Sequence, residues 1–324
     1  MFAIAFALAC FAAGVSASSG GLIYSDCGDH CEVSGYDGTP SGVLDIPKTA
    51  NIGGRTLPVT AVCPFAFSNC GKITGVLIPD GVINIGDSAF SCCTELKSVS
   101  LPETLEKIGD DAFLGCVKLT GITVPSSIKT VGKRAFAQCE SLTSAKIEGG
   151  TVTLSEGIFA GCVKLSEVRL PNSLRTVGGF AFSGCTALKK LTVPDGVLFV
   201  GENAFRDCTG LENVIFPDSI SSLGDCLFLG CSGLKTVCFK GSAAKWEKLS
   251  ANQTGFPSGV RIITDFSGVV PGDCDGDGDL TNKDIVLLFR GITGGVSDLS
   301  VYDFNQDGDA DNKDVVALFR YVSK

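Results

Sequence analysis

Residues 113–136 read FLGCVKLTGITVPSSIKTVGKRAF, and this stretch decides the fold because the chain repeats it. A phenylalanine returns every 23 residues, and a cysteine follows it three residues later. The phenylalanines are Phe67, Phe90, Phe113, Phe136, Phe159, Phe182, Phe205 and Phe228. The cysteines are Cys70, Cys93, Cys116, Cys139, Cys162, Cys185, Cys208 and Cys231. Such a run without an insertion predicts a solenoid, and its period lies within the range of leucine-rich repeats.

One unit can be interpreted residue by residue. Residues 119–124 are expected to form a short strand whose leucine, isoleucine and valine face the core. Pro125 ends this strand, because proline cannot donate a hydrogen bond to a ladder. Ile128 and Val131 supply a second apolar pair, and Gly132 is expected to turn the chain. No unit can bury its apolar face alone, so we expect the stability to come from stacked neighbours.

The pattern has one irregular unit and two different ends. Residues 148–150 (Glu-Gly-Gly) stand where proline belongs, and Ser155 replaces the turn glycine, which we interpret as a local irregularity. Hairpin-like strands are expected over residues 22–47, before the repeats start. After the repeats, residues 241–249 predict a short helix that carries the only tryptophan, and residues 260–264 predict a last strand.

The repeat resembles the BspA-type leucine-rich repeat of bacterial surface proteins. This resemblance covers roughly residues 21–265 and implies an α/β solenoid, a leucine-rich repeat built of 23-residue units with a cap at each end. A linker is then expected over residues 266–272, followed by a separate module over residues 273–324.

Two columns of outward strand positions are expected to run along the solenoid, one from Gly75 and one from Leu77, each continued by every 23rd residue. Neither column contains an aromatic ring, which disfavours the stacking of sugars on this face. The middle of the columns is charged, with Lys146, Glu167, Arg169 and Lys190. This composition predicts either a surface for a protein or peptide ligand or an ordinary solvated sheet face.

The end of the chain carries one twelve-residue loop twice, DCDGDGDLTNKD at residues 273–284 and DFNQDGDADNKD at residues 303–314. Both loops alternate oxygen side chains, have glycine at position 6 and end on a carboxylate, as a calcium loop does. The predicted ligands are Asp273, Asp275, Asp277, Asp279 and Asp284 in the first loop, and Asp303, Asn305, Asp307, Asp309 and Asp314 in the second. We therefore expect two calcium ions.

A short apolar run follows each loop, IVLLFR at residues 285–290 and VVALFR at residues 315–320, whereas Pro271 and its neighbouring glycines rule out a helix before the first loop. Duplicated loops with exit helices only resemble a type I-like dockerin, a small all-α calcium-binding module that docks exported proteins onto a cohesin. The resemblance implies partner-binding roles for Asn282, Lys283, Phe289, Arg290, Asn312, Lys313, Phe319 and Arg320. Because both copies match, either half is expected to face the cohesin.

Together the two resemblances imply a non-catalytic exported interaction protein. Its expected partner is a cohesin-bearing scaffold protein, bound in a calcium-dependent way, while the solenoid presents a protein-binding surface. Dockerin-bearing proteins commonly belong to polysaccharide-degrading assemblies. A cellulosome-like assembly of this kind is therefore the expected setting. The alternative is a cell-surface adhesin or structural spacer whose calcium module is only structural.

The beginning of the chain predicts export. Residues 2–13 are apolar, and Val15-Ser16-Ala17 suits a secretory signal peptide cleaved after Ala17, which places the protein outside the cell or on its surface. The apolar stretch is shorter than the ~20 residues that a membrane span needs. The formal net charge is −9 and no basic patch is visible, so we expect no nucleic-acid partner.

Reactive side chains are few. His30 is the only histidine, which removes most nucleophile–base pairs, and no carboxylates are placed for acid–base work, so we expect no enzyme. The repeat cysteines are expected to pack reduced, as small hydrophobes. Cys27 and Cys31 are expected to form a disulfide. Their loop can also be drawn as half a zinc site, but no second ligand pair has matching spacing.

Overall fold

The computed structural model describes residues 17–19, 21–251, 253–265, 282–293, 299–304 and 309–323. The predicted linker and all of the predicted signal peptide before Ala17 lie outside the described residues. The chain divides into two compact units. One consists of Met1–Val237 and Glu247–Arg261, and the other of Cys238–Trp246 and Ile262–Lys324.

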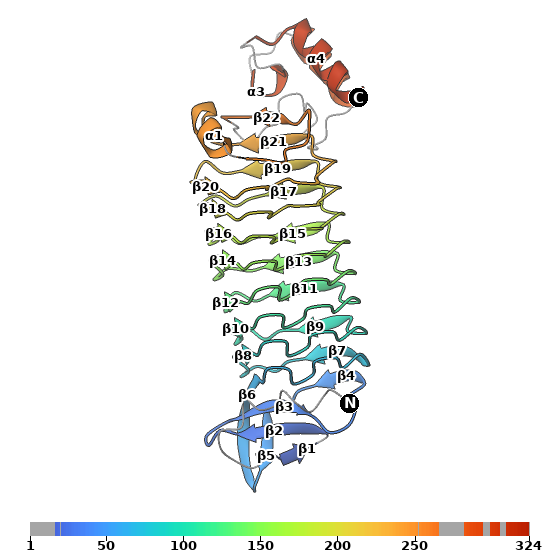
Figure 1. Cartoon of the computed structure of the whole chain (residues 1–324), viewed down its shortest axis with the longest axis vertical. Helices are drawn as coiled ribbons and strands as arrows, with labels where there is room; N and C mark the ends of the chain where they lie inside the picture. Colours follow the sequence, from blue (N-terminus) through green and yellow to red (C-terminus); the bar gives the residue numbers. More distant parts are fainter. Residues whose placement is uncertain are drawn as a thin grey trace. The chain divides into compact units, whose positions relative to one another are not determined.

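The first unit begins with a three-stranded antiparallel meander and a separate hairpin. Strand β1 (Ala17–Ser19) pairs with β2 (Leu22–Asp26), which pairs with β3 (Cys31–Tyr36), and β5 (Thr49–Ile52) pairs with β6 (Arg55–Val62). Strands β3 and β6 lie side by side in parallel (Figure 1). The hairpin predicted at the start of residues 22–47 is thus confirmed, and a second hairpin follows it.

Strand β4 (Gly42–Asp45) belongs to the solenoid and not to a cap hairpin, because it pairs in parallel with β7 (Ile73–Leu77). From β7 onward each turn adds one strand to each of two parallel ladders (Figure 1), and in the first ladder the strand pairing is interrupted between β9 and β11 and between β15 and β17. The first ladder continues with β9 (Ser98–Ser100), β11 (Gly121–Val124), β13 (Ser144–Ile147), β15 (Glu167–Arg169), β17 (Lys190–Thr192) and β19 (Asn213–Phe216). The second contains β8 (Asn84–Ile85), β10 (Lys107–Ile108), β12 (Thr130–Val131), β14 (Thr153–Leu154), β16 (Thr176–Val177), β18 (Phe199–Val200) and β20 (Ser222–Leu223).

The fold is therefore a parallel β-solenoid, and the predicted α/β class is wrong. Residues 60–240 are all described, and none of them lies in an α-helix. The reason is length: between Pro125 and Gly132 the chain has room only for an apolar turn and the two-residue strand β12. The strand predicted over residues 119–124 is confirmed as β11, and Ile128 and Val131 are buried as expected.

The irregular unit stays local. Strand β13 pairs with the strand before it and the strand after it, so the first ladder passes through residues 148–150 without a break. In the second ladder, by contrast, the pairing runs from β6 to β12 and starts again at β14. The disturbance is thus confined to one side of one turn.

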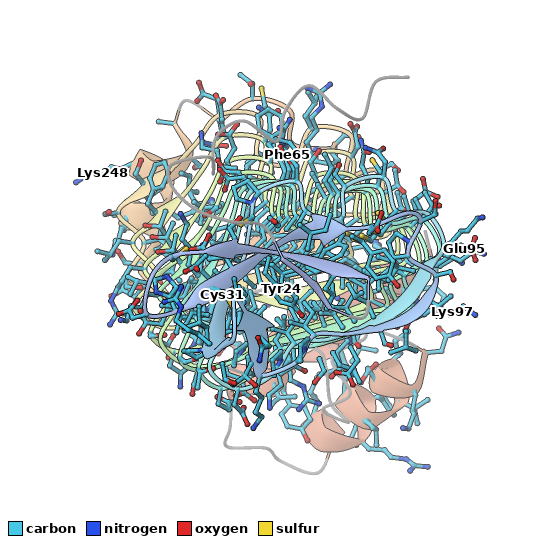
Figure 2. The ribbon with its side chains drawn as sticks, turned by 90° about the horizontal axis from the view of Figure 1, so that it is seen from below. Tyr24, Cys31, Phe65, Glu95, Lys97 and Lys248 are labelled. Carbon is cyan, nitrogen blue, oxygen red and sulfur yellow. The ribbon has the colours of Figure 1, made fainter. Side chains whose placement is uncertain are left out.

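A column of phenyl rings fills the core of the solenoid. The rings from Phe67 to Phe228 have no exposed surface, and each stacks on the next with ring centroids 5.3–5.9 Å apart and planes within 6–23°. Stacked pairs of this kind add roughly 0.5–1.5 kcal/mol each beyond burial. Figure 2 views the ribbon nearly along the ladder axis, with Tyr24 and Cys31 near the centre and Glu95 and Lys97 at the edge.

Consecutive hydrogen-bonded backbone turns within one repeat explain why phenylalanine, cysteine and leucine follow one another three residues apart. The amide of Cys116 donates to the carbonyl of Phe113 (3.2 Å), and the amide of Leu119 donates to the carbonyl of Cys116 (3.0 Å). Hydrogen bonds from residue i+3 to residue i place side chains three apart on the same side. All three side chains therefore point into the core, where their exposed surface is 0%.

The repeat glycine does not turn the chain, and this expectation is corrected. Gly132 is not among the residues with positive φ. The left-handed turn lies instead at residues of many types, with φ between 52° and 60°: Phe65, Ser88, Asp111, Arg134, Phe180, Asn203 and Cys226. A Cβ on Gly132 would lie 2.3 Å from the amide nitrogen of Asp110 in the turn before. Glycine is needed there because two turns of backbone come very close.

The end of the first unit and the second unit contain the helices. The predicted short helix is α1 (Ala243–Ser250), in which Trp246 is buried, and the predicted last strand is β22 (Arg261–Ile263), which follows β21 (Thr236–Phe239). Near the end of the chain lie α2 (Asn282–Thr293), α3 (Leu299–Tyr302) and α4 (Asn312–Val322). Their core is a cluster of Leu288, Phe304 and Leu318.

We predict that Gly132→Ala destabilises the solenoid by about 1–3 kcal/mol or more, because the added methyl group must push two turns apart. The free energy of unfolding from denaturant titration measures this loss. Gly149→Ala is the matched control, since a Cβ on Gly149 meets no atom within 4 Å. Equal stability of the two variants would contradict the close-approach explanation.

Candidate functional sites

The outward columns of the first ladder are exposed in the middle and buried at the end. Side chains of β9, β13, β15 and β17 that belong to these columns are exposed, as predicted. Thr236 and Cys238, the last members, are each only 2% exposed, so the prediction is wrong for them. The accessible part of this face therefore lies over the middle turns.

A hollow of about 460 Å³ lies on this exposed part of the ladder. Polar side chains from β9, β11, β13 and β15 line it: Ser100, Thr123, Ser144, Lys146, Glu167 and Arg169. Three of the four residues of the predicted charged middle are among them. The hollow offers hydroxyl groups and both signs of charge, which suits hydrogen bonding to a peptide.

The charges at this hollow are paired on the surface. Lys146 Nζ lies 2.7 Å from Glu148 Oε1, and Arg169 Nη2 lies 2.8 Å from Glu167 Oε1. Exposed pairs of this kind contribute roughly 0–1 kcal/mol, because both partners remain hydrated. A charged ligand can replace one partner of either ion pair at little cost in free energy, so these pairs do not block binding.

The cysteine column is chemically protected. The thiol of Cys116 donates to the carbonyl of Phe90 (3.2 Å), and the later repeat cysteines do the same to the phenylalanine 26 positions earlier. Burial raises the pKa of Cys116 and of Cys162 to about 12. The expectation that these residues are reduced and buried is confirmed for Cys93 to Cys231, whereas Cys70 is half-buried.

The predicted disulfide between Cys27 and Cys31 is wrong, because both residues are thiols. Strand β3 turns the side chain of Cys31 into the core, where its Sγ lies 3.5 Å from the carbonyl oxygen of Pro58. Cys27 lies in the exposed loop before β3. The strand thus buries the Cys31 thiol in the core, whereas the Cys27 thiol stays on the exposed loop.

Helices α2 and α4 expose equivalent residues. Their sequences NKDIVLLFR and NKDVVALFR share one burial pattern from Asn282 to Arg290 and from Asn312 to Arg320. The predicted partner-binding residues are all exposed: Asn282, Lys283, Phe289, Arg290, Asn312, Lys313, Phe319 and Arg320. Val286, Phe289, Val316 and Phe319 are apolar and yet 51%, 51%, 47% and 56% exposed. Asn312, Lys313 and Arg320 also border a shallow hollow of about 390 Å³ beside α4.

The last predicted calcium ligand of each loop is fully buried. Asp284 and Asp314 each have no exposed surface, and each is the third residue of its helix. Asp314 Oδ2 accepts a hydrogen bond from the amide of Asp311 (2.8 Å), and Asp311 caps α4 in return. Asp311 is a capping residue that the loop pattern did not single out, although aspartate is a preferred N-cap residue.

Only some of the other predicted ligands lie among the described residues. Asp303 and Asp309 lie among the described residues of the second loop. Asp273, Asp275, Asp277, Asp279, Asn305 and Asp307 lie outside the described residues. A buried carboxylate needs compensation from hydrogen bonds or a cation, so the burial of Asp284 and Asp314 fits a calcium ligand as well as a helix cap.

A model of the BspA type leucine rich repeat region matches residues 60–172 and 152–255, which is more than half of the chain. The chain belongs to the BspA-type leucine-rich repeat family. The match covers most of the solenoid and stops before the predicted calcium loops. No curated protein sequence matches the chain.

Several solved leucine-rich repeat proteins are similar to this chain, and the first named here supports the fold. The T. pallidum leucine-rich repeat protein is 25% identical, with 76% of this chain and 100% of that chain covered and a TM-score of 0.51. A leucine-rich repeat protein from Bacteroides ovatus is 26% identical over 76% of this chain and 78% of that chain, with a TM-score of 0.43. A leucine rich cell surface protein from Faecalibacterium prausnitzii is 17% identical over 76% and 100%, with a TM-score of 0.34. Among the described residues, no helix has the length and apolar character of a membrane span.

We predict that a maleimide at pH 8 alkylates Cys92 at least about tenfold faster than Cys93, because the thiolate reacts and burial raises the pKa of Cys93. Cys92 is exposed, Cys93 is buried, and the two are neighbours in sequence, so each controls for the other. Timed quenching followed by mass spectrometry measures both rates. Equal rates in the native protein would show that the cysteine column is open to solvent.

Proposed function

We propose that this leucine-rich repeat protein is a non-catalytic, exported binding protein with a dockerin-like module at its C-terminal end. The module binds a cohesin-bearing scaffold protein when calcium fills its two loops. The setting is the cell surface or the medium, in a polysaccharide-degrading, cellulosome-like assembly. The ladder face with its 460 Å³ hollow serves as a second surface, for a protein or peptide.

One observation carries the docking proposal: two helices present the same exposed apolar face. An apolar side chain that is half-exposed gains little in the free protein, and burial against a partner is worth roughly 25 cal/mol per Å². Val286 with Phe289, and Val316 with Phe319, are spaced three apart, so each pair lies on one side of its helix. Basic Arg290 and Arg320 flank these pairs, which favours an acidic rim on the partner.

Calcium would be held by the carboxylate and amide oxygens of both loops, with Asp284 and Asp314 closing the coordination from the helix side. A bound divalent ion neutralises clustered carboxylates and orders the loop backbone. Because the described core of the predicted module centres on Leu288, Phe304 and Leu318, the ion would contribute much of its stability.

We predict that the two faces can replace each other. In the full chain, Asn282→Ala with Lys283→Ala should weaken binding to a cohesin-bearing partner less than about threefold, since the equivalent face of α4 remains. Asn312→Ala with Lys313→Ala should behave alike, and the four changes together should lower affinity at least 100-fold, as hot-spot losses do. Calcium-dependent capture from the exported proteins of the source organism identifies the scaffold, and calorimetry measures the affinities.

A matched control separates the two surfaces. Lys146→Ala with Arg169→Ala changes the ladder hollow only and should leave cohesin binding unchanged. Loss of binding on a single helix face would contradict the interchangeable arrangement. Failure to capture any cohesin-bearing protein would favour the alternative, an adhesin or structural spacer whose calcium module has only a structural role.

We also predict that calcium protects α2 and α4 from trypsin. With calcium, cleavage after Arg290 and Arg320 should be at least about tenfold slower than with a chelator. Without the ion the loops are no longer ordered, and the helices that follow them unfold more often. Mass spectrometry of the fragments measures both sites. Peptides from residues 100–200 serve as the internal control, since the solenoid has no predicted calcium ligand. Equal protection with the chelator would refute a calcium role in folding.

A further inference from the structure

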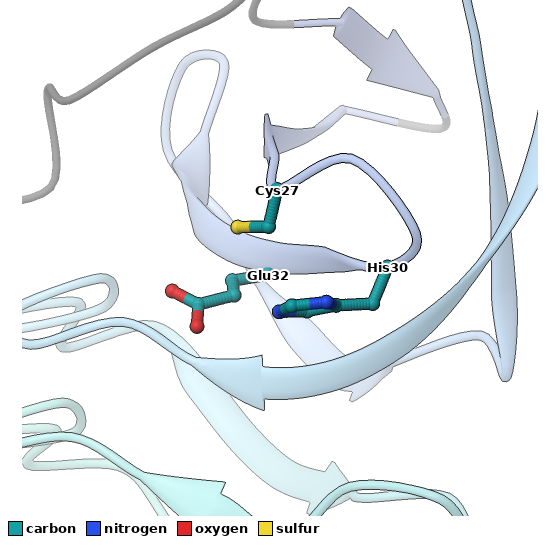
Figure 3. A group of neighbouring side chains, drawn as sticks. All are labelled: Cys27, His30 and Glu32. Carbon is teal, nitrogen blue, oxygen red and sulfur yellow. The ribbon is translucent and has the colours of Figure 1, made fainter.

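The loop between β2 and β3 gathers three side chains of different chemistry. The Sγ of Cys27, a ring nitrogen of His30 and a carboxylate oxygen of Glu32 all lie within 4.8 Å of one another. Figure 3 shows the three side chains extending toward a common point at the surface of the hairpin. Thiol, imidazole and carboxylate are the three side-chain types that bind zinc in proteins.

The hairpin itself holds these residues together. The amide of Cys27 donates to the carbonyl of His30 (3.0 Å) and closes a tight turn, in which Gly28 has φ +96°. Arg55 donates to the carbonyl of Gly28 (2.7 Å) and also pairs with Asp26, so β6 braces the loop. This pairing also engages the positive charge of Arg55, which would otherwise oppose a cation nearby.

The alternation of β3 selects the ligand that the sequence did not suggest. Cys31 points into the core, and the neighbouring Glu32 therefore lies on the other side of the strand, with His30 just before it. The sequence offers no second ligand pair with matching spacing, so a zinc site at Cys27 and His30 needs a further ligand. Glu32 supplies it from within the same hairpin.

Two of the three candidate ligands are oriented by neighbours. His30 Nδ1 lies 2.6 Å from Asp29 Oδ1, so a proton shared there leaves Nε2 as the nitrogen that can bind a metal. The thiol of Cys63 donates to Glu32 Oε2 at 3.2 Å and holds that carboxylate in place. A carboxylate behind a ligating histidine is the usual outer-shell arrangement of zinc sites.

We propose that Cys27, His30 and Glu32 form a binding site for a divalent zinc-class metal ion, with water in the fourth position. A thiolate and a carboxylate together carry two negative charges, which balance the ion. Around tetrahedral zinc, bonds of about 2.0–2.3 Å place ligand atoms roughly 3.3–3.8 Å apart. The three groups therefore need to close by only about 1 Å, which small side-chain rotations provide at exposed Cys27 and half-buried His30 and Glu32. The bound ion pins the hairpin loop at the N-terminal end of the solenoid.

The test uses the full chain with calcium in excess, so that the acidic loops are filled. Cobalt(II) is the probe, because a thiolate ligand gives it an intense near-ultraviolet absorption, and zinc competition then gives the zinc affinity. We expect one equivalent to bind with this absorption in the unchanged protein. Cys27→Ser should abolish the absorption, and His30→Ala and Glu32→Gln should each weaken zinc binding at least about tenfold.

Cys92→Ser is the matched control, because Cys92 is also an exposed thiol but lies outside the cluster. It should keep the full absorption and zinc affinity. Zinc should raise the melting temperature of the unchanged protein and of Cys92→Ser, but not of Cys27→Ser. Unchanged zinc affinity in Cys27→Ser and His30→Ala, or no stoichiometric binding at all, would overturn the proposal. A zinc-free melting temperature equal to that of the unchanged protein shows that each variant is folded.

Discussion

Every turn of this solenoid depends on the stacking of one buried phenyl ring on the next. The ring spacing of 5.3–5.9 Å is slightly wider than the ~4.8 Å between neighbouring strands, so each ring stays above its neighbour along the column. A single inserted residue would move one ring out of the column and break the register of both ladders. This constraint explains why the period of 23 is kept from Phe67 to Phe228.

The same constraint determines what the other repeat positions can be. Turns stacked this closely leave no space for a Cβ at Gly132, so glycine is selected there by contact between turns and not by backbone conformation. At Cys116 the side chain must be small and apolar, and it can also donate to the carbonyl of the preceding turn. A thiol meets both needs, which accounts for buried cysteines that serve neither as disulfides nor as reactive groups.

The polar and charged sites lie at positions whose side chains take no part in the stacking of the turns. The ladder hollow with Lys146 and Arg169 uses outward strand positions, and the loop with Cys27 and His30 uses the hairpin before the first ladder turn. Helices α2 and α4 form their own small core and leave apolar side chains outside it. Each of these surfaces can therefore vary in sequence without disturbing the phenyl column.

The repeat pattern predicts the solenoid, its register and its inward residues, because identical turns make each repeat position meet copies of itself. The exposed residues of α2 and α4 were expected from the resemblance of the two copies to a dockerin, because the apolar pattern alone would not predict an exposed Phe289 or Phe319. Three features come from the packing of the folded chain: the second side of each turn is a strand, Gly132 meets Asp110, and Glu32 joins Cys27 and His30. These features depend on distances between backbone segments, which are set when the turns and hairpins pack.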